Sequence, residues 1–178
     1  MKGLVFTEFL EMVEDRFGFE VANRIIENSD LSSGGVYTSV GVYDHSELFK
    51  IVGELSKETG TEASKLVKTF GEYLFSRFID LHPNMMAKFA DTFSLIESVE
   101  NIIHVEVEKI YPGAQLPTFK TDRISDEEMK VTYISNRKMS DFAEGLMIGC
   151  SNHFKENLNI EKKSNDDGSV VEFMLTRN

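Results

Sequence analysis

The stretch MKVTYISNRKMSDFAEGL, residues 129–146, decides the fold. Its first part, 129–135, is dense in β-branched and aromatic residues, which is typical of a strand. The segment 139–158 then returns to helical character. Near the end of the chain, the runs NIEKKS and VVEFMLT flank Asn165-Asp166-Asp167-Gly168, the composition of a β-hairpin. The carboxyl-terminal part is therefore predicted to hold a small antiparallel sheet interrupted by one helix.

Upstream of this stretch, apolar residues recur at the spacing of α-helices. Loop-forming residues interrupt the pattern at Gly18, at 29–35, at Gly60 and at His82-Pro83. The segment VYTSV at 36–40 is expected to extend briefly. The sequence predicts helices over 4–17, 20–28, about 44–59, 61–81 and 94–110, the last capped by Ser94. The fold class is α+β, a single domain with a helical N-terminal subdomain of about 1–60 and a C-terminal subdomain of about 61–178.

The composition disfavours several classes of protein. Thirty acidic against nineteen basic residues give a net charge of -11, which disfavours a surface that neutralises nucleic acid phosphates. No apolar run approaches the length of a membrane span, and the opening MKGLVFTEFLEM lacks a small-residue cleavage site. The lone Cys150 permits no internal disulfide. We therefore expect a cytoplasmic protein.

The common catalytic and nucleotide-binding motifs are missing from the sequence. The remaining enzyme hypothesis is a thiol–imidazole pair of Cys150 and His153, but no third group is placed to orient it. Cys150 is better interpreted as a small core residue, and His45, His82 and His153 as ordinary histidines. We expect a protein that is not an enzyme.

His104 lies on the helix predicted over 94–110. On a helical wheel it lies about a quarter-turn or more away from the apolar face of that helix. That face consists of Leu95, Val99, Ile103 and Ile110. By periodicity alone, His104 is interpreted as a surface or edge residue, and the acidic residues of the helix as a solvated face: Glu97, Glu100, Glu106 and Glu108.

The segment YISNR, residues 133–137, matches the Y-x-S-x-R signature of the haem nitric-oxide/oxygen binding (H-NOX) family. A haem carries two propionates. In an extended segment, Tyr133, Ser135 and Arg137 point to one side and converge on those carboxylates. Arginine contributes most, because its planar fork gives charge-assisted contacts that can be bidentate.

The resemblance extends over nearly the whole chain. The opening MKG, SKETG at 56–60, a GE-containing helix at 71, Pro117 thirteen residues after His104, and RKMSDFAEGL at 137–146 occur in the family's order and spacing. The resemblance implies a stand-alone bacterial member, with haem b clasped between the helical N-terminal part and the C-terminal part. It also implies that His104 is the proximal iron ligand and that Pro117 presses on the macrocycle and distorts it.

The resemblance further implies which side chains line the distal side of the haem. None of these side chains can donate a hydrogen bond: Val5, Phe9, Leu74, Phe78, Phe142 and Leu146. In oxygen-binding members, a tyrosine at the position of Phe142 stabilises bound dioxygen, which is more polarised than bound nitric oxide or carbon monoxide. Tyr73 is discounted, because adjacent helical residues point about 100 degrees apart. We expect a sensor that binds nitric oxide and carbon monoxide and excludes dioxygen.

The resemblance also implies how the signal leaves the protein. Nitric oxide opposite a histidine weakens the iron–histidine bond, so release of His104 is expected to let the two parts of the fold shift. A separate partner enzyme would read the shift, either a histidine kinase or a cyclic-di-GMP synthase or phosphodiesterase. The alternative that stays open is a haem-free interaction domain or a binder of another apolar ligand.

Overall fold

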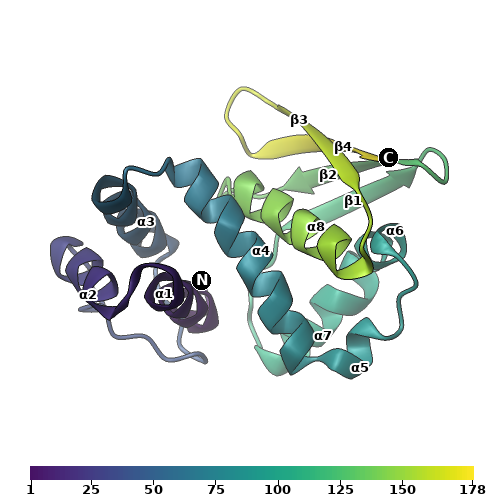
Figure 1. Cartoon of the computed structure of the whole chain (residues 1–178). Helices are drawn as coiled ribbons and strands as arrows, with labels where there is room; N and C mark the ends of the chain where they lie inside the picture. Colours follow the sequence, from purple (N-terminus) through teal and green to yellow (C-terminus); the bar gives the residue numbers. More distant parts are fainter. The chain divides into compact units, whose positions relative to one another are not determined.

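Helices occupy the chain up to residue 110, and a four-stranded sheet with one further helix follows (Figure 1). The α+β fold class predicted from the sequence is confirmed. The structure is a computed structural model that describes residues 1–178. It divides into two units, Met1–Phe70 and Gly71–Asn178, with the boundary inside helix α4 (Ala63–Leu81). No helix combines the length and the apolar character that crossing a membrane requires.

The first unit is helical. It contains α1 (Gly3–Phe17), α2 (Phe19–Asn28), α3 (His45–Thr59) and the start of α4. Asp44 caps α3 by accepting the amide of Ser46 at 2.8 Å, and Gly60 ends the helix in the left-handed conformation that suits glycine. The apolar positions that recur at helical spacing are the buried ones: Phe6, Phe9, Met12, Ile25, Leu48, Ile51 and Leu55.

The segment 36–40, where VYTSV was expected to extend briefly, forms no paired strand. The extended pairing in this region is one isolated antiparallel bridge between Lys2 and Val42. The loop is held against the start of α1 instead, because the amide of Gly3 donates to the carbonyl of Gly41 at 2.9 Å. A Cβ at Gly3 would lie 1.9 Å from the Thr38 carbonyl oxygen, so the close approach requires glycine.

Glu47, on the first turn of α3, is a buried carboxylate that organises the preceding loop. It accepts hydrogen bonds from the Ser32 hydroxyl at 2.5 Å, the Ser33 hydroxyl at 2.5 Å and the Tyr37 hydroxyl at 2.7 Å. Burial by itself raises the pKa of Glu47, but these donors outweigh it and lower the pKa to about 2. The charged form of Glu47 therefore stabilises the folded state.

We expect the free energy of unfolding to fall as the pH drops from about 5 toward 2. The pKa of Glu47 in the folded state lies below its ordinary value of 4.5. Ionised Glu47 therefore contributes about 3 kcal/mol to the free energy of unfolding above pH 4.5, and this contribution is lost as the pH falls toward 2. Urea unfolding of Glu47→Gln at pH 7 should show a loss of that order, shrinking at acid pH. Glu54→Gln, on the same helix and paired with the exposed Lys57, is the control. Equal losses in the two variants would contradict the prediction.

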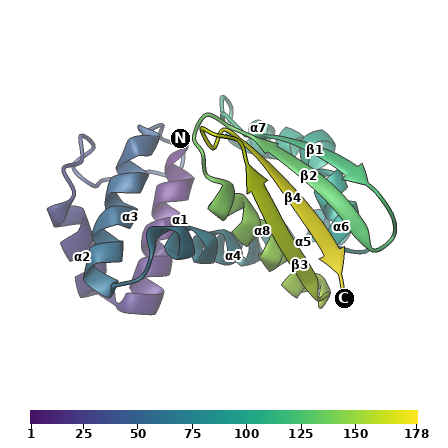
Figure 2. The same cartoon turned by 90° about the horizontal axis from the view of Figure 1, so that it is seen from above.

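The second unit is built on an antiparallel sheet with the strand order β1-β2-β4-β3 (Figure 2). The strands are β1 (Thr118–Arg123), β2 (Glu128–Ile134), β3 (Leu158–Ser164) and β4 (Val170–Arg177). Alternate residues of β2 and β4 are buried on one face, where α8 (Ser140–Phe154) and α6 (Thr92–Glu97) pack. The core between them contains Phe93, Ile96, Met129, Val131, Tyr133, Ala143, Met147, Val171, Phe173 and Leu175.

Strand β1 has no counterpart in the sequence-based prediction. Its sequence, TFKTDR, contains a single apolar side chain, that of Phe119, so it lacks the alternation that marks β2. The strand forms because it pairs with β2 over its whole length, from Thr118 opposite Ile134 to Arg123 opposite Met129. Tertiary pairing, rather than local propensity, determines this edge strand.

The single helix predicted over 94–110 is wrong in two respects. It begins earlier, at α6, where Asp91 accepts the amide of Ser94 at 2.7 Å, so Asp91 is the cap. It is also interrupted by a π-helical turn, η1 (Val99–Ile103), before α7 (His104–Ile110). The amide of His104 donates to the carbonyl of Val99, five residues back. The short helix α5 (Pro83–Met86) precedes this segment.

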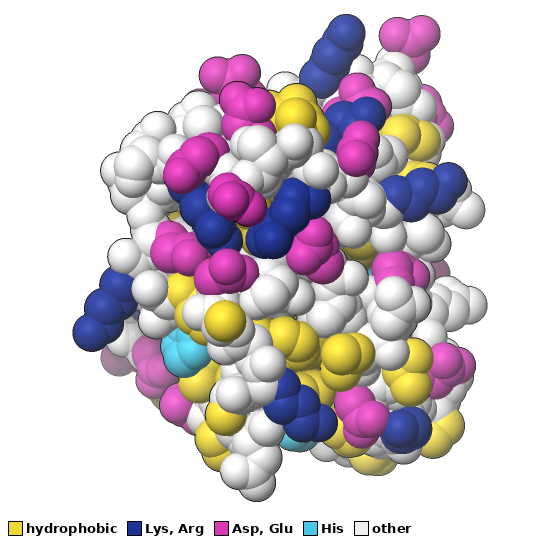
Figure 3. Space-filling view, turned by 90° about the vertical axis from the view of Figure 1, so that its right-hand side faces the viewer, with side chains coloured by type: hydrophobic (Ala, Val, Ile, Leu, Met, Phe, Trp, Pro, Cys, Tyr) yellow, Lys and Arg dark blue, Asp and Glu magenta, His cyan; other side chains and the backbone are white.

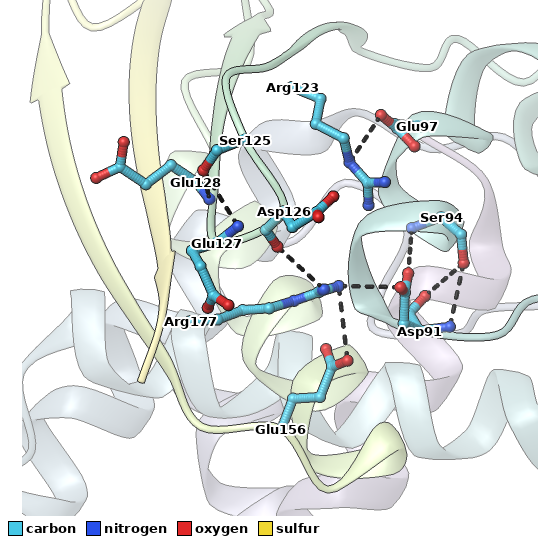
Figure 4. Close-up of polar contacts among 10 residues, drawn as sticks. All are labelled: Asp91, Ser94, Glu97, Arg123, Ser125, Asp126, Glu127, Glu128, Glu156 and Arg177. Atoms are coloured by element: carbon cyan, nitrogen blue, oxygen red, sulfur yellow. Dashed lines mark hydrogen bonds and ion pairs between the residues drawn. The ribbon is translucent and has the colours of Figure 1, made fainter.

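Arg177, near the end of β4, connects the sheet to α6 (Figure 4). Its guanidinium lies 4.0 Å from the ring centroid of Phe93 and within 3.3 Å of the Asp91 carboxylate and 3.6 Å of the Glu156 carboxylate. Arg123 lies 5.4 Å from the same ring centroid. These contacts hold the start of α6, and with it the segment that leads to His104, against the sheet.

Charged side chains of both signs are mixed on the face drawn in Figure 3, and hydrophobic side chains gather mainly in the lower half of that view, with charged side chains among them. The basic side chains on this face lie among acidic ones (Figure 3). This face therefore offers no continuous basic surface to nucleic acid.

Candidate functional site

The signature residues 133–137 do not form one extended segment. Strand β2 ends at Ile134, and the amide of Lys138 donates to the carbonyl of Ser135 in a turn. Tyr133 is buried, and its hydroxyl accepts the amide of Met139 at 3.1 Å at the start of α8. The expectation that Tyr133, Ser135 and Arg137 point to one side of a strand is therefore wrong, because the turn changes the direction of the backbone after Ile134.

Arg137 lies beside the segment that contains Pro117. Its guanidinium donates to the backbone carbonyl of Gln115 at 2.5 Å and to the side-chain oxygen of Gln115 at 3.0 Å. The hydroxyl of Ser135 accepts the amide of Arg137 at 3.2 Å. The structure thus brings the turn after β2 together with the loop before β1, and both contain residues predicted to contact the ligand.

His104 is the first residue of α7, and its side chain is only 16% exposed. Its ring packs near the ring of Phe119, with centroids 5.8 Å apart, and its Nδ1 lies 3.1 Å from a carboxylate oxygen of Glu100. Burial lowers the pKa of His104, and this outweighs the opposing effect of Glu100, so the neutral imidazole is favoured. With Nδ1 occupied by Glu100, the nitrogen left for a metal is Nε2.

The helical wheel misplaced His104, and the π-helical turn explains why. An α-helical wheel assumes a constant rotation per residue, whereas the wider turn at Val99–Ile103 changes the phase of every later residue. After this turn, Ile110 is exposed while His104 is largely buried. Glu100 was likewise assigned to a solvated face, but it contacts both His104 and the backbone of Phe119.

Helices α4 and α8 approach closely and bring apolar site residues together. A Cβ at Gly71 would lie 2.3 Å from the carbonyl oxygen of Phe142 and 2.8 Å from the amide nitrogen of Leu146. Phe78 and Leu146 belong to one apolar cluster, which also contains Val99 and Ile103 next to His104. Leu74 is half-buried on the same helix as Phe78.

We expect Gly71→Val to destabilise the protein by about 3 kcal/mol, because a side chain there overlaps backbone atoms of α8 that no rotamer change can move. Gly53→Val is the matched control, since a Cβ at Gly53 in α3 meets no atom within 4 Å. Urea unfolding should show a large loss for the first variant and almost none for the second. Equal stabilities would contradict the close packing of α4 on α8.

The remaining predicted residues, Val5 and Phe9, lie on α1 in the first unit. Phe9 is fully buried, and its ring meets that of Phe70 edge to face with centroids 5.1 Å apart. Val5 is half-buried one turn earlier. Phe9 thus belongs to the apolar core of that unit.

Other candidate sites receive little support. Cys150 is buried beside Phe75 and Leu95, and burial raises the pKa of its thiol to about 12, which disfavours a thiolate nucleophile. A cavity of about 310 Å³ is lined by residues of α4, α5 and α7, and by none of the predicted site residues. No group of three or more His, Cys, Asp or Glu side chains is arranged to hold a bare metal ion.

The residues of the second unit fit a haem. His104 presents one neutral imidazole nitrogen, which suits an iron whose equatorial ligands come from a macrocycle. Phe78, Leu146 and Ile103 pack on one apolar cluster, and Ile103 directly precedes His104 in the chain. Arg137 supplies a charge suited to a carboxylate.

Comparison with known proteins agrees with this chemistry. The model of the haem-NO-binding family (HNOB) matches residues 2–162. The Fe(II) unliganded H-NOX protein from K. algicida is similar with a TM-score of 0.94 and 41% identity, over 100% of this chain and 97% of that one. The H-NOX from Shewanella woodyi, solved with IWP-051 in the Fe(II)CO ligation state, gives 0.85 and 41%, over 100% and 95% of the chains.

The H-NOX protein from S. oneidensis in the Fe(II)NO ligation state gives a TM-score of 0.91 and 28% identity, over 100% of this chain and 99% of that one. The curated proteins yield no match. The family model and the two relatives at 41% identity span most or all of the sequence. This chain therefore belongs to the haem-NO-binding, or H-NOX, family.

Proposed function

We propose that the protein binds haem b with His104 as the protein ligand to iron, and that it is a nitric oxide sensor rather than an enzyme. The observation that carries this proposal is the position of His104, which is largely buried, neutral, and held through Nδ1 so that Nε2 remains for the metal. A ferrous haem supplies the atom to which nitric oxide or carbon monoxide binds.

The propionates are assigned to the turn that follows β2. Arg137 would exchange its contacts with Gln115 for charge-assisted hydrogen bonds to a propionate, and Ser135 lies beside it in the same turn. Tyr133 is proposed as the third contact, although its hydroxyl also holds the first residue before α8. Pro117 lies two residues after Gln115 and is proposed to press on the macrocycle.

The distal lining is proposed to select among gases. Its six side chains carry no hydrogen-bond donor: Val5, Phe9, Leu74, Phe78, Phe142 and Leu146. A donor in an apolar site stabilises bound dioxygen more than nitric oxide or carbon monoxide. The lining therefore favours the two less polarised ligands and excludes dioxygen.

The signal is proposed to pass to a separate partner enzyme, either a histidine kinase or a cyclic-di-GMP synthase or phosphodiesterase, in the cytoplasm. Release of His104 would free α7 from the iron, and the π-helical turn before it is a place where the helix can change register. Autophosphorylation of a candidate kinase should therefore differ between the ferrous and the nitric-oxide-treated protein. Identical rates in the two states would exclude that kinase as the partner.

Haem titration of the purified protein tests the cofactor assignment. We expect one haem per chain and a pyridine haemochrome spectrum of haem b. A protein that stays colourless after haem supplementation would contradict the proposal and favour a haem-free interaction domain or a binder of another apolar ligand.

A further inference from the structure

One carboxylate oxygen of Glu100 contacts both the backbone of β1 and the imidazole of His104. Its Oε1 accepts the backbone amide of Phe119 at 2.7 Å and lies 3.1 Å from Nδ1 of His104. The amide of Phe119 belongs to β1, whereas Glu100 belongs to the π-helical turn. Because the side chain of Glu100 is 37% exposed, it is neither a buried core group nor a fully solvated one.

We propose that Glu100 is a positioning residue for His104, holding its imidazole as the Nδ1–H tautomer and in a fixed orientation. The proposal rests on the proposed function, in which His104 ligates iron. An ionised carboxylate can only accept hydrogen bonds, so the nitrogen that faces it must carry the proton. The other nitrogen, Nε2, then keeps its lone pair for the metal, and the anionic acceptor makes the imidazole a stronger donor to iron.

The hydrogen bond from the amide of Phe119 holds the carboxylate of Glu100 in place. The amide of Phe119 is part of a strand paired with β2 throughout its length, so it is a rigid anchor. The ring of Phe119 packs near the ring of His104, at 5.8 Å, and near that of Tyr133, at 5.5 Å. Glu100 thereby ties the imidazole to the strand that begins directly after Pro117 and lies beside the signature residues.

The π-helical turn contributes to this arrangement. In a continuous α-helix, the amide of His104 would donate to the carbonyl of Glu100, four residues back. Here the amide of His104 donates to the carbonyl of Val99 instead of that of Glu100. The side chain of Glu100 reaches both Phe119 and His104 from this position.

The test is the iron–histidine stretching band of the ferrous, gas-free holoprotein, measured by resonance Raman spectroscopy. Glu100→Gln should lower its frequency, because a neutral amide oxygen polarises the imidazole less than a carboxylate does. The amide oxygen can still accept the amide of Phe119, so the Tm should stay close to that of the wild type. Glu100→Ala, which removes both bonds, should also weaken haem binding by roughly 10- to 100-fold.

Glu106→Gln is the matched control, because Glu106 is on α7, pairs with Lys109 at 2.7 Å and carries the same charge. It should leave the band unchanged. An unchanged frequency in Glu100→Gln, or an equal shift in Glu106→Gln, would overturn the positioning role while leaving the haem assignment intact. A wild-type protein that binds haem but lacks the band would overturn the ligand role of His104, and this proposal with it.

Discussion

His104→Ala should lose most of its haem during purification. The imidazole of His104 is proposed as the one protein ligand to iron. Its removal should therefore weaken haem binding more than the roughly 10- to 100-fold typical of changes to residues that only hold a metal ligand in place. The remaining contacts, from Arg137 and the apolar side chains, do not coordinate the metal. The haem content per chain and the Soret band of the variant measure the effect directly.

Added imidazole should partly restore the Soret band of His104→Ala, because it can enter the space left by the side chain and bind the iron. His45→Ala is the matched control, since His45 is exposed beside Asp44 on the first unit and should keep its full haem content. Haem content and spectrum equal to those of the wild type in His104→Ala would show that another residue is the ligand.

Phe142→Tyr should allow the ferrous protein to bind dioxygen. The change adds a hydroxyl donor to a lining that has none, and a hydrogen bond to a charged acceptor contributes about 1.5–3 kcal/mol. The variant should therefore hold dioxygen roughly 10- to 100-fold more tightly than the wild-type protein, which forms no stable dioxygen complex. The measurement is the dissociation rate after mixing with an oxygen scavenger, followed in the Soret region.

Phe142→Leu is the control that distinguishes the effect of the added hydroxyl from the effect of altered packing. It changes the size of the side chain without adding a hydrogen-bond donor. It should behave as the wild type toward dioxygen. A slower dissociation in both variants would attribute the effect to space rather than to a hydrogen bond. No change in Phe142→Tyr would show that this side chain does not reach the bound gas.

Much of the fold was predictable from the sequence, because local signals decide most of its elements. Gly18, Gly60 and His82-Pro83 end helices where the periodicity stops, and the Asn165–Gly168 turn joins β3 to β4. Strand β1 was not predictable, since its residues are mostly polar and it depends on pairing with β2. The π-helical turn was not predictable either, because apolar periodicity does not encode a change from α- to π-helical hydrogen bonding.

The site was predictable to a different degree for each residue. The side chain of Arg137 has a chemistry that suits carboxylates wherever it is placed, so its assignment did not depend on the extended geometry that proved wrong. The role of His104 stays a prediction that rests on the resemblance to a family, because the environment of His104 depends on the phase change at residues 99–103. The contacts of Glu100 were not predictable, since Phe119 lies on strand β1, which the sequence did not reveal.

The absorption spectrum of the haem-loaded ferrous protein, recorded under argon, in air and with nitric oxide, tests whether the protein is a nitric oxide sensor. We expect a Soret band under argon that shifts when nitric oxide is added, and no stable dioxygen form in air. A protein without a Soret band, a band that nitric oxide leaves unchanged, or a stable dioxygen form in air would contradict it.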